Sequence, residues 1–200
     1  LVRMWRTEHQ TLRFFIASAV FRDGLAAIFA FAGVLAAGSY GFSASEIIVL
    51  GVAANVAAGA GAMIAGFLDD RFGPKPVIIA GLIVIIAGGV PILFSAEAGV
   101  FWVCALVLSF CVGPVQSSSR SFLARITPPE RAGENFGLYA TTGRAVSFLG
   151  PAMFALSISI LGYQRAGTLG IIVVLVLGLF LIIPVRPDAP QRSMAAMRED

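Results

Sequence analysis

The chain has 200 residues, the length of one ordinary domain, but its composition does not suit a water-soluble protein. Hydrophobic residues make up 58% and charged residues only 12%, whereas a soluble domain has roughly a quarter of its residues charged. The formal net charge is +3, yet the basic residues are dispersed between apolar runs, which argues against a nucleic-acid partner. The composition therefore indicates a protein dissolved in a lipid bilayer.

The chain opens with a basic and aromatic segment, residues 1–11, which we interpret as a cytoplasmic lead-in or an interdomain linker. It has neither the apolar stretch nor the cleavage site of a signal peptide, and its first residue, Leu1, leaves open that the natural chain continues upstream. A helix needs about 20 mostly apolar residues to cross the hydrocarbon core. Six stretches meet this requirement, at 12–38, 45–68, 76–95, 99–125, 136–161 and 167–185.

These stretches predict an all-α polytopic membrane protein in which residues 12–185 form one domain of six transmembrane helices. We interpret residues 186–200 as a mobile cytoplasmic tail. Lys and Arg collect in cytoplasmic loops, and if both termini share one side, the opposite side receives only Arg165. The predicted cytoplasmic side receives Arg3, Arg6, Arg13, Arg71, Lys75, Arg120, Arg125, Arg131, Arg186, Arg192 and Arg198.

Polar residues are distributed unevenly over the six predicted helices. The third and sixth helices have no ionisable residue at 76–96 or 167–185 and are expected to face lipid. A charge at membrane depth is costly unless it finds a partner or water, so the polar residues of the other four helices are candidates for solute binding or proton coupling. These candidates are Arg22 and Asp23 in the first helix, Asn55 in the second, Gln116 and Arg120 in the fourth, and Arg144 in the fifth.

Three of the candidates, Asp23, Gln116 and Arg144, are expected to share one layer. At a rise of about 1.5 Å per residue, each lies roughly 12 to 15 Å from the cytoplasmic boundary, near the depth at which secondary transporters bind substrates. Another interpretation is that Asp23 and Arg144 form a buried structural ion pair. Arg22 and Asp23 are consecutive, point about 100° apart on a helix, and are not natural partners.

Two Gly-Pro dipeptides lie inside predicted spans, Gly113-Pro114 in the fourth and Gly150-Pro151 in the fifth. Proline removes a backbone N–H and clashes with the preceding turn, which a span tolerates where its neighbours or a cavity satisfy the freed carbonyls. We treat all four residues as candidate hinges, with a static kink as the alternative. Small residues at four-residue spacing in 57–66 predict close packing of the second helix.

The loop after the second predicted helix, residues 66–75, carries the most specific motif of the chain. Its sequence, GFLDDRFGPK, resembles the major facilitator superfamily signature G-x-L-x-D-R-x-G-x-K at each fixed position, Gly66, Leu68, Asp70, Arg71, Gly73 and Lys75. The resemblance implies a cytoplasmic gating loop that latches one conformational state. Asp70 offers a carboxylate that suits the N-terminus of a neighbouring helix.

Other motifs resemble the vacuole effluxer-like branch of this superfamily, which is related to autophagy-linked amino-acid permeases. They are Phe21-x-Asp23-Gly24, Gly113-Pro114-x-Gln116, and the segments 136–140 and 148–151. The resemblance implies the C-terminal six-helix half of such a transporter, built from two inverted three-helix repeats. In this family the first and fourth helices line the cavity, the second and fifth flank it, and the third and sixth face outward, which fits the distribution of polar residues.

We therefore expect half of a secondary active transporter that moves a small solute, amino acid-like by resemblance, by alternating access. Its expected partners are the solute, the bilayer of a bacterial plasma membrane, and another six-helix half in the same natural chain or a second copy. The alternative is a non-transporting assembly or sensor module. We expect no enzyme, cofactor or metal, because His9 precedes the first span and no catalytic or ligand cluster is spaced plausibly.

Overall fold

The structure, a computed structural model, describes residues 9–186, and it is helical with no strand in that range. Predictions that concern residues 1–8 and 187–200, including Arg3, Arg6, Arg192, Arg198 and the tail, lie outside the described residues. Within the described range, six helical segments are long and apolar enough to cross a membrane. This confirms the predicted all-α fold with six spans.

The first four spans are single helices, α2 (His9–Tyr40), α3 (Ala44–Phe72), α4 (Pro74–Phe94) and α5 (Ala98–Ile126). The fifth span contains a short 3-10 turn, η1 (Pro129–Arg131), followed by α6 (Ala132–Ala145) and α7 (Leu149–Leu161). A second 3-10 turn, η2 (Gln164–Ala166), leads into the sixth span, α8 (Gly167–Ile182). Most observed ends lie within a few residues of the predicted ones.

Local sequence signals account for several of the helix ends. Ser43 and Glu46 form a capping box at the start of α3, in which the Glu46 carboxylate accepts from the Ser43 backbone N–H at 2.8 Å. Gly73 adopts a φ of 83° between α3 and α4, and Pro74 starts the next helix. Gly162 ends α7 in the left-handed conformation, with a φ of 78°.

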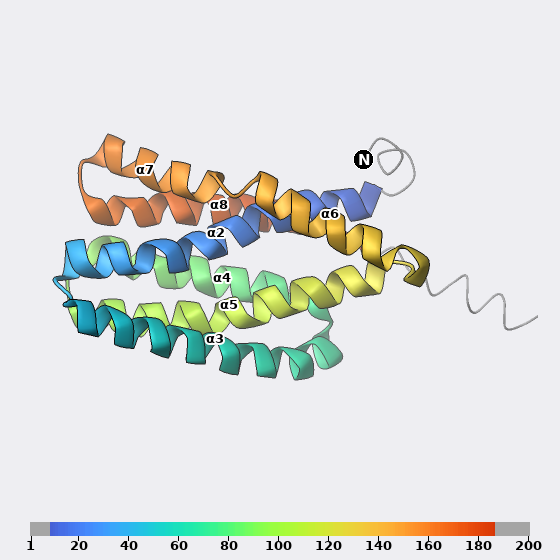
Figure 1. Cartoon of the computed structure of the whole chain (residues 1–200), viewed down its shortest axis with the longest axis horizontal. Helices are drawn as coiled ribbons and strands as arrows, with labels where there is room; N and C mark the ends of the chain where they lie inside the picture. The colour runs from blue at the N-terminus through green and yellow to red at the C-terminus, as the bar shows by residue number, and fades with distance from the viewer. Residues whose placement is uncertain (1–8, 187–200) are drawn as a thin grey trace, which may run out of the picture.

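The helices lie roughly side by side, with α3 at one edge of the bundle and α7 at the other (Figure 1). Helix α3 packs on α5, α5 on α4, α4 on α8, and α8 on both α2 and α7. The α2–α3, α4–α5 and α7–α8 connections gather at one end, and the α3–α4 and α5–α6 connections at the other (Figure 1).

The expectation that α4 and α8 face lipid is correct for only one side of each helix. Phe94 of α4 and Phe180 of α8 are 82% and 67% exposed, but Ile85 and Leu175 on the same helices are buried in the core. In both α2 and the sixth span, half of the most apolar 18-residue stretch is buried inside the bundle. In α3 and the fifth span the buried share of this stretch is the smallest. The absence of ionisable residues did not identify the outermost helices, because an all-apolar helix packs equally well against protein and against lipid.

The two Gly-Pro dipeptides have different structural outcomes. Helix α5 continues through Gly113 and Pro114, whereas the fifth span is interrupted by three turn residues, 146–148, just before Gly150 and Pro151. A short non-helical stretch between α6 and α7 is visible in Figure 1. The break divides the fifth span into two segments, each of which contacts α2.

Candidate functional site

A polar hollow of about 670 Å³ lies between α3 and α5. It brings together three of the predicted site residues, Asn55 from α3 and Gln116 and Arg120 from α5. The remaining lining residues are mostly small, with two hydroxyls among them: Phe29, Ala58, Gly59, Ala62, Val112, Gly113, Ser117 and Ser121. No carboxylate lines the hollow within residues 9–186.

Several polar groups that line the hollow have no hydrogen-bond partner among the described residues and could bind a ligand. The Asn55 side-chain N–H donates to the Gly51 carbonyl at 2.8 Å, which leaves the amide oxygen as an acceptor. Gln116 and Arg120 lie one turn apart on α5, and neither has a hydrogen bond or ion pair with any other described residue. An unpaired guanidinium beside amide groups is suited to binding an anion such as a carboxylate.

Small residues allow the α3 and α5 backbones to pack closely around this hollow. A Cβ built on Gly61 would overlap the Phe110 carbonyl oxygen, and one on Gly113 would overlap the Ala58 carbonyl oxygen. Pro114 has no backbone N–H, so the Phe110 carbonyl has no helical hydrogen-bond partner. The Gly61 backbone lies against this carbonyl. Such an approach is typical of Cα–H···O contacts. The predicted close packing of the second helix is observed here.

Arg22 does not line the hollow, because its side chain holds α6. Its Nη1 donates to the Tyr139 carbonyl oxygen at 3.3 Å, and the guanidinium carbon lies 4.1 Å from the centre of the Tyr139 ring. The Tyr139 hydroxyl is hydrogen bonded to the Ser119 hydroxyl at 2.7 Å, which links α5 to the same cluster. Arg22 therefore joins the first span to α6, the first segment of the fifth span, by a cation–π contact and a hydrogen bond.

Asp23 points to α7 and is only 6% exposed. Its Oδ2 accepts a short hydrogen bond from the Gly150 backbone N–H, a group left free because the helix is interrupted before it. A Cβ at Gly150 would lie 2.8 Å from the Ala27 Cβ and 3.2 Å from the Asp23 Oδ2. Glycine is therefore required for this approach.

The structure does not bring the three predicted layer residues into one site. Gln116 lines the hollow and Asp23 contacts the N-terminus of α7. Arg144 is exposed near the C-terminal end of α6 and does not line the hollow. Within the described residues no ion pair links Asp23 to Arg144, so the alternative of a buried pair between them is absent from this structure.

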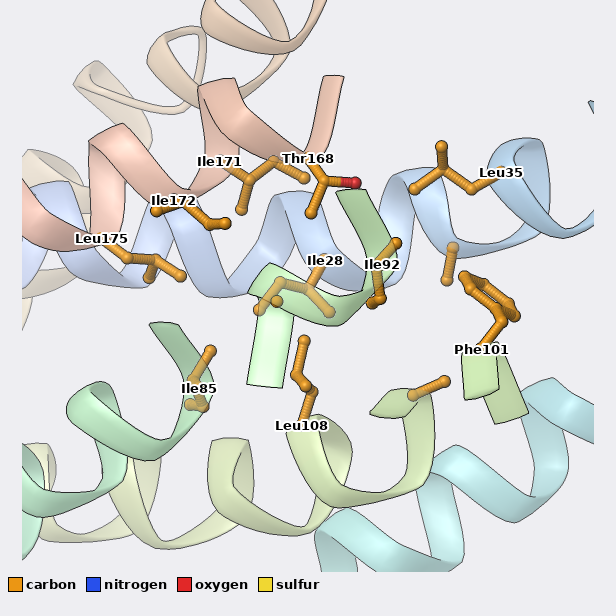
Figure 2. A pocket seen from close by; sticks show the side chains of 13 residues that line it. Ile28, Leu35, Ile85, Ile92, Phe101, Leu108, Thr168, Ile171, Ile172 and Leu175 are labelled. Carbon is orange, nitrogen blue, oxygen red and sulfur yellow. The ribbon is translucent and has the colours of Figure 1, made fainter. Parts of the chain in front are cut away.

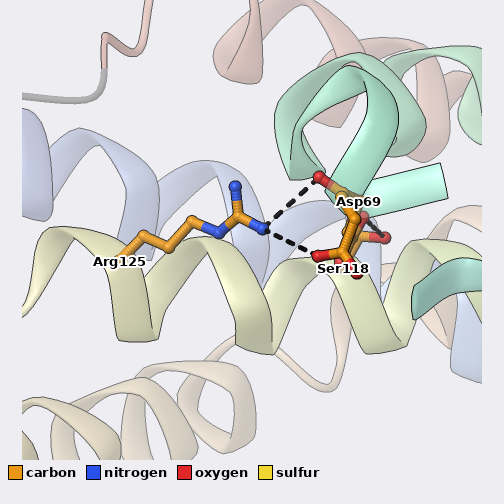
Figure 3. Close-up of polar contacts among 4 residues, drawn as sticks. Asp69, Ser118 and Arg125 are labelled. Atoms are coloured by element: carbon orange, nitrogen blue, oxygen red, sulfur yellow. Dashed lines mark hydrogen bonds and ion pairs between the residues drawn. The ribbon is translucent and has the colours of Figure 1, made fainter. Parts of the chain in front are cut away.

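The last turn of α3 contains an aspartate that sequence reasoning missed. Asp69 is 4% exposed, and its Oδ1 accepts from the Ser118 hydroxyl at 2.6 Å (Figure 3). The Asp69 carbonyl oxygen accepts from Arg125 Nη2 at 3.3 Å, and the same nitrogen lies 3.9 Å from the exposed carboxylate of Asp70. The four-residue spacing of Gly61, Ala65 and Asp69 along one face of α3 was a signal that could have identified the buried carboxylate.

Residues of the signature motif at 66–75 lie at the turn between α3 and α4. Gly73 donates its N–H to the Asp69 carbonyl and has a φ of 83°, and Lys75 Nζ donates to the Ile183 carbonyl at 2.7 Å. Gly66 has open space around it, and Arg71 is exposed. The motif thus fixes the α3–α4 turn against α5 and the end of α8.

A small cavity of about 40 Å³ lies among α2, α4, α5 and α8 (Figure 2). Its lining is aliphatic and aromatic apart from Thr168, whose hydroxyl has no hydrogen-bond partner within the described residues. The cavity has no charged group with which to orient a polar solute, and we regard it as a packing gap of the core.

Comparison with known proteins agrees with this architecture. The sequence model of the Major Facilitator Superfamily matches residues 14–198. The chain belongs to the major facilitator superfamily. It is 25% identical over 160 residues to the uncharacterized MFS-type transporter YxiO of Bacillus subtilis, an alignment that covers 80% of this chain and 37% of that protein.

Fungal and mycobacterial relatives are also similar. Autophagy-related protein 22 of Cryptococcus neoformans is 30% identical over 165 residues, which cover 73% of this chain and 30% of that protein. The uncharacterized MFS-type transporter Rv1250 of Mycobacterium tuberculosis is 29% identical over 133 residues, which cover 65% of this chain and 23% of that protein. The chain therefore spans well under half the length of these curated relatives.

Proposed function

We propose that this chain is one six-helix half of a secondary transporter that moves a small solute across the membrane by alternating access. The second half is provided by the same natural protein or by another copy. The observation that carries the proposal is the hollow between α3 and α5, where Asn55, Gln116 and Arg120 present unsatisfied polar groups from otherwise apolar spans. Polar groups at membrane depth are costly unless they have partners or water, which a solute pathway supplies.

We propose an amino acid-like solute. The Arg120 guanidinium is suited to the solute carboxylate, because its planar fork matches a carboxylate with two parallel hydrogen bonds. The free amide oxygen of Asn55 is an acceptor suited to the solute ammonium group. The resemblance of the chain to autophagy-linked amino-acid permeases supports the same solute class.

This assignment changes the roles expected of the other charged candidates. Arg22 packs on Tyr139, and Asp23 contacts Gly150, so neither side chain is free to bind the solute in the conformation described. Arg144 is exposed outside the hollow and is available to the other half. We therefore assign recognition to the hollow and assign Arg22 and Asp23 to the fifth span.

We further propose that the chain lies in a bacterial plasma membrane, with the start of the first span and the end of the last span on the cytoplasmic side. Arg71, Lys75 and Arg125 lie at the end of the bundle that carries the α3–α4 connection, and Arg165 lies at the opposite end. This distribution follows the preference of Lys and Arg for the cytoplasmic side. The Asp69, Ser118 and Arg125 contacts would then be the cytoplasmic latch.

The test is uptake of radiolabelled amino acids, presented as a mixture and then singly, by liposomes that contain the complete natural protein. Arg120→Gln should reduce uptake at least tenfold, because it removes the carboxylate partner. Arg13→Gln is the matched control, since Arg13 is also exposed but lies outside the hollow, and it should leave uptake unchanged.

Two results would contradict the proposal. If the folded wild-type protein moves no amino acid and no other small solute, the transport proposal is wrong, and the alternative of a non-transporting assembly or sensor module is favoured. If Arg120→Gln transports amino acids as well as the wild type does, the hollow is not the recognition site.

A further inference from the structure

The two consecutive charged residues of α2 hold the two segments of the broken fifth span separately. Arg22 contacts Tyr139 of α6, which lies before the break at 146–148. Asp23 contacts Gly150 of α7, which lies after it. Each segment therefore has its own polar attachment to the same turn of the first span.

These attachments differ in chemistry. A guanidinium stays protonated at any physiological pH, so the attachment of α6 through Arg22 is permanent. The attachment of α7 depends on a carboxylate, which is a negative charge at the N-terminus of a 13-residue helix when ionised and a neutral group when protonated. Only the second attachment can be changed by a proton.

Within residues 9–186, no cation forms an ion pair with Asp23. Helices α7 and α8 contain no ionisable side chain between 149 and 161 or between 167 and 182. Arg144 of α6 is exposed, the guanidinium of Arg22 lies over the Tyr139 ring, and Arg120 of α5 lines the hollow. The Asp23 carboxylate, buried to all but 6% of its surface, is balanced chiefly by the Gly150 N–H and the α7 dipole.

The geometry at Gly150 makes the contact sensitive to small displacements. Its backbone lies so close to α2 that a single added carbon would meet Ala27 and the Asp23 carboxylate. Pro151 follows directly and supplies no N–H that could replace the contact. The three turn residues at 146–148 separate α7 from α6, so the two segments are not parts of one continuous helix.

We propose that Asp23 binds one proton from the aqueous phase, and that protonation weakens the attachment of α7 to α2 while α6 stays attached through Arg22. The fifth span then bends at 146–148. This inference deepens the proposed function, since it rests on that function for the claim that the bending serves transport, and it names the proton as the coupling ion. The sign follows from the carboxylate: the attachment is strong at high pH, where Asp23 is ionised, and weakens as pH falls and Asp23 becomes neutral.

The test is a spin-label distance measurement on the complete natural protein in lipid nanodiscs over a range of pH. Labels are placed on exposed positions at Val52 of α3 and Ala155 of α7, helices that lie at opposite edges of the bundle (Figure 1). The control pair joins Val52 to Ala140, which is exposed on α6. Native cysteines, including Cys104 and Cys111, are replaced by alanine.

In the wild-type background, the α3–α7 distance distribution should shift as pH falls, and the α3–α6 distribution should not. Asp23→Asn, which is uncharged at every pH and close to the same size, should show the low-pH α3–α7 distribution throughout. Gly150→Ala displaces α7 by sterics and should also show that distribution at high pH. It keeps the inference testable if Asp23→Asn does not fold.

An α3–α7 distance that is independent of pH in the folded wild-type protein would overturn the inference, as would an unchanged pH shift in Asp23→Asn. Failure of this inference is distinguishable from failure of the proposed function. Amino-acid flux without the pH-dependent shift removes only the role of Asp23, whereas the shift without flux of any solute removes the transport proposal and leaves the proton-sensitive attachment.

Discussion

The two Gly-Pro dipeptides of this chain have the same residues and opposite outcomes. At Gly113-Pro114 the helix continues, and at Gly150-Pro151 it is preceded by a break. Pro114 leaves the Phe110 carbonyl without its helical partner, whereas Pro151 lies in the first turn of α7, where a backbone N–H has no partner within the helix. The surroundings differ: the small residues of α3 pack against the first dipeptide, and a carboxylate of α2 accepts the N–H of Gly150 in the second.

This difference shows that a Gly-Pro dipeptide in a span marks a weak point, a position where the helix can be interrupted, but does not by itself determine whether it is interrupted. Close backbone packing on Gly113 leaves α5 no room to open, and the freed Phe110 carbonyl lies against Gly61. At Gly150 the Asp23 carboxylate stabilises the free N–H that an interrupted helix exposes. The neighbouring helix therefore decides whether the weak point becomes a break.

The largest loss of stability is expected at Gly113, where α3 and α5 pack closely. Gly113→Val would place a side chain into the Ala58 and Ala62 backbone of α3. Overpacking of this kind costs about 3 kcal/mol, so the detergent-solubilised protein should unfold at a clearly lower temperature in a thermal size-exclusion assay. Gly59→Ala is the matched control, because the space around Gly59 is open. An equal loss in both variants would show that packing at Gly113 is not special.

The next largest loss of stability is expected at Asp23, whose carboxylate accepts the Gly150 N–H beside the break in the fifth span. Asp23→Ala leaves the buried Gly150 N–H without a partner, which costs about 1–3 kcal/mol, whereas Asp23→Asn retains an acceptor oxygen and should lose less stability. We also expect Asp23→Asn to abolish solute flux while the protein remains in the membrane. Thermal unfolding and liposome uptake are measured on the same preparations. Wild-type uptake by Asp23→Asn would remove this residue from the mechanism.

A smaller effect is expected at the attachment of α6. Tyr139→Phe removes the hydrogen bond to Ser119 but keeps the ring over which Arg22 lies. The loss should be about 1 kcal/mol in unfolding free energy. Combining Tyr139→Phe with Ser119→Ala should cost little more than either change alone, because both remove the same bond. Fully additive losses would indicate that the two hydroxyls act independently.

The smallest effect is expected from the prolines themselves. Pro151→Ala restores a backbone N–H, but the break should persist, because Asp23 still accepts from Gly150. Pro114→Ala should likewise leave α5 continuous, and each change should alter stability by less than about 1 kcal/mol. Hydrogen exchange of the amides at 146–150 measures the break directly. Strong new protection there in Pro151→Ala would show that proline, and not the carboxylate, causes the interruption.

The sequence by itself determined the solvent of this protein, the number of its spans and the family to which it belongs. Apolar stretches of transmembrane length need no tertiary information, because each must satisfy its backbone within its own helix. The turn within the signature motif was also predictable, since Gly73 and Pro74 favour a turn in any context. The sequence also predicts Asn55, Gln116 and Arg120 as candidates, and these three residues line one hollow.

Only the tertiary structure decided which charged residues meet. Depth along a helix placed Asp23, Gln116 and Arg144 in one layer, but the rotation of each helix sends the three side chains in different directions. Helix packing likewise determined that Asp69 is buried against Ser118 whereas its neighbour Asp70 is exposed. Rise and hydropathy are properties of one helix, whereas these contacts depend on the packing of several helices, and a single sequence does not specify that packing residue by residue.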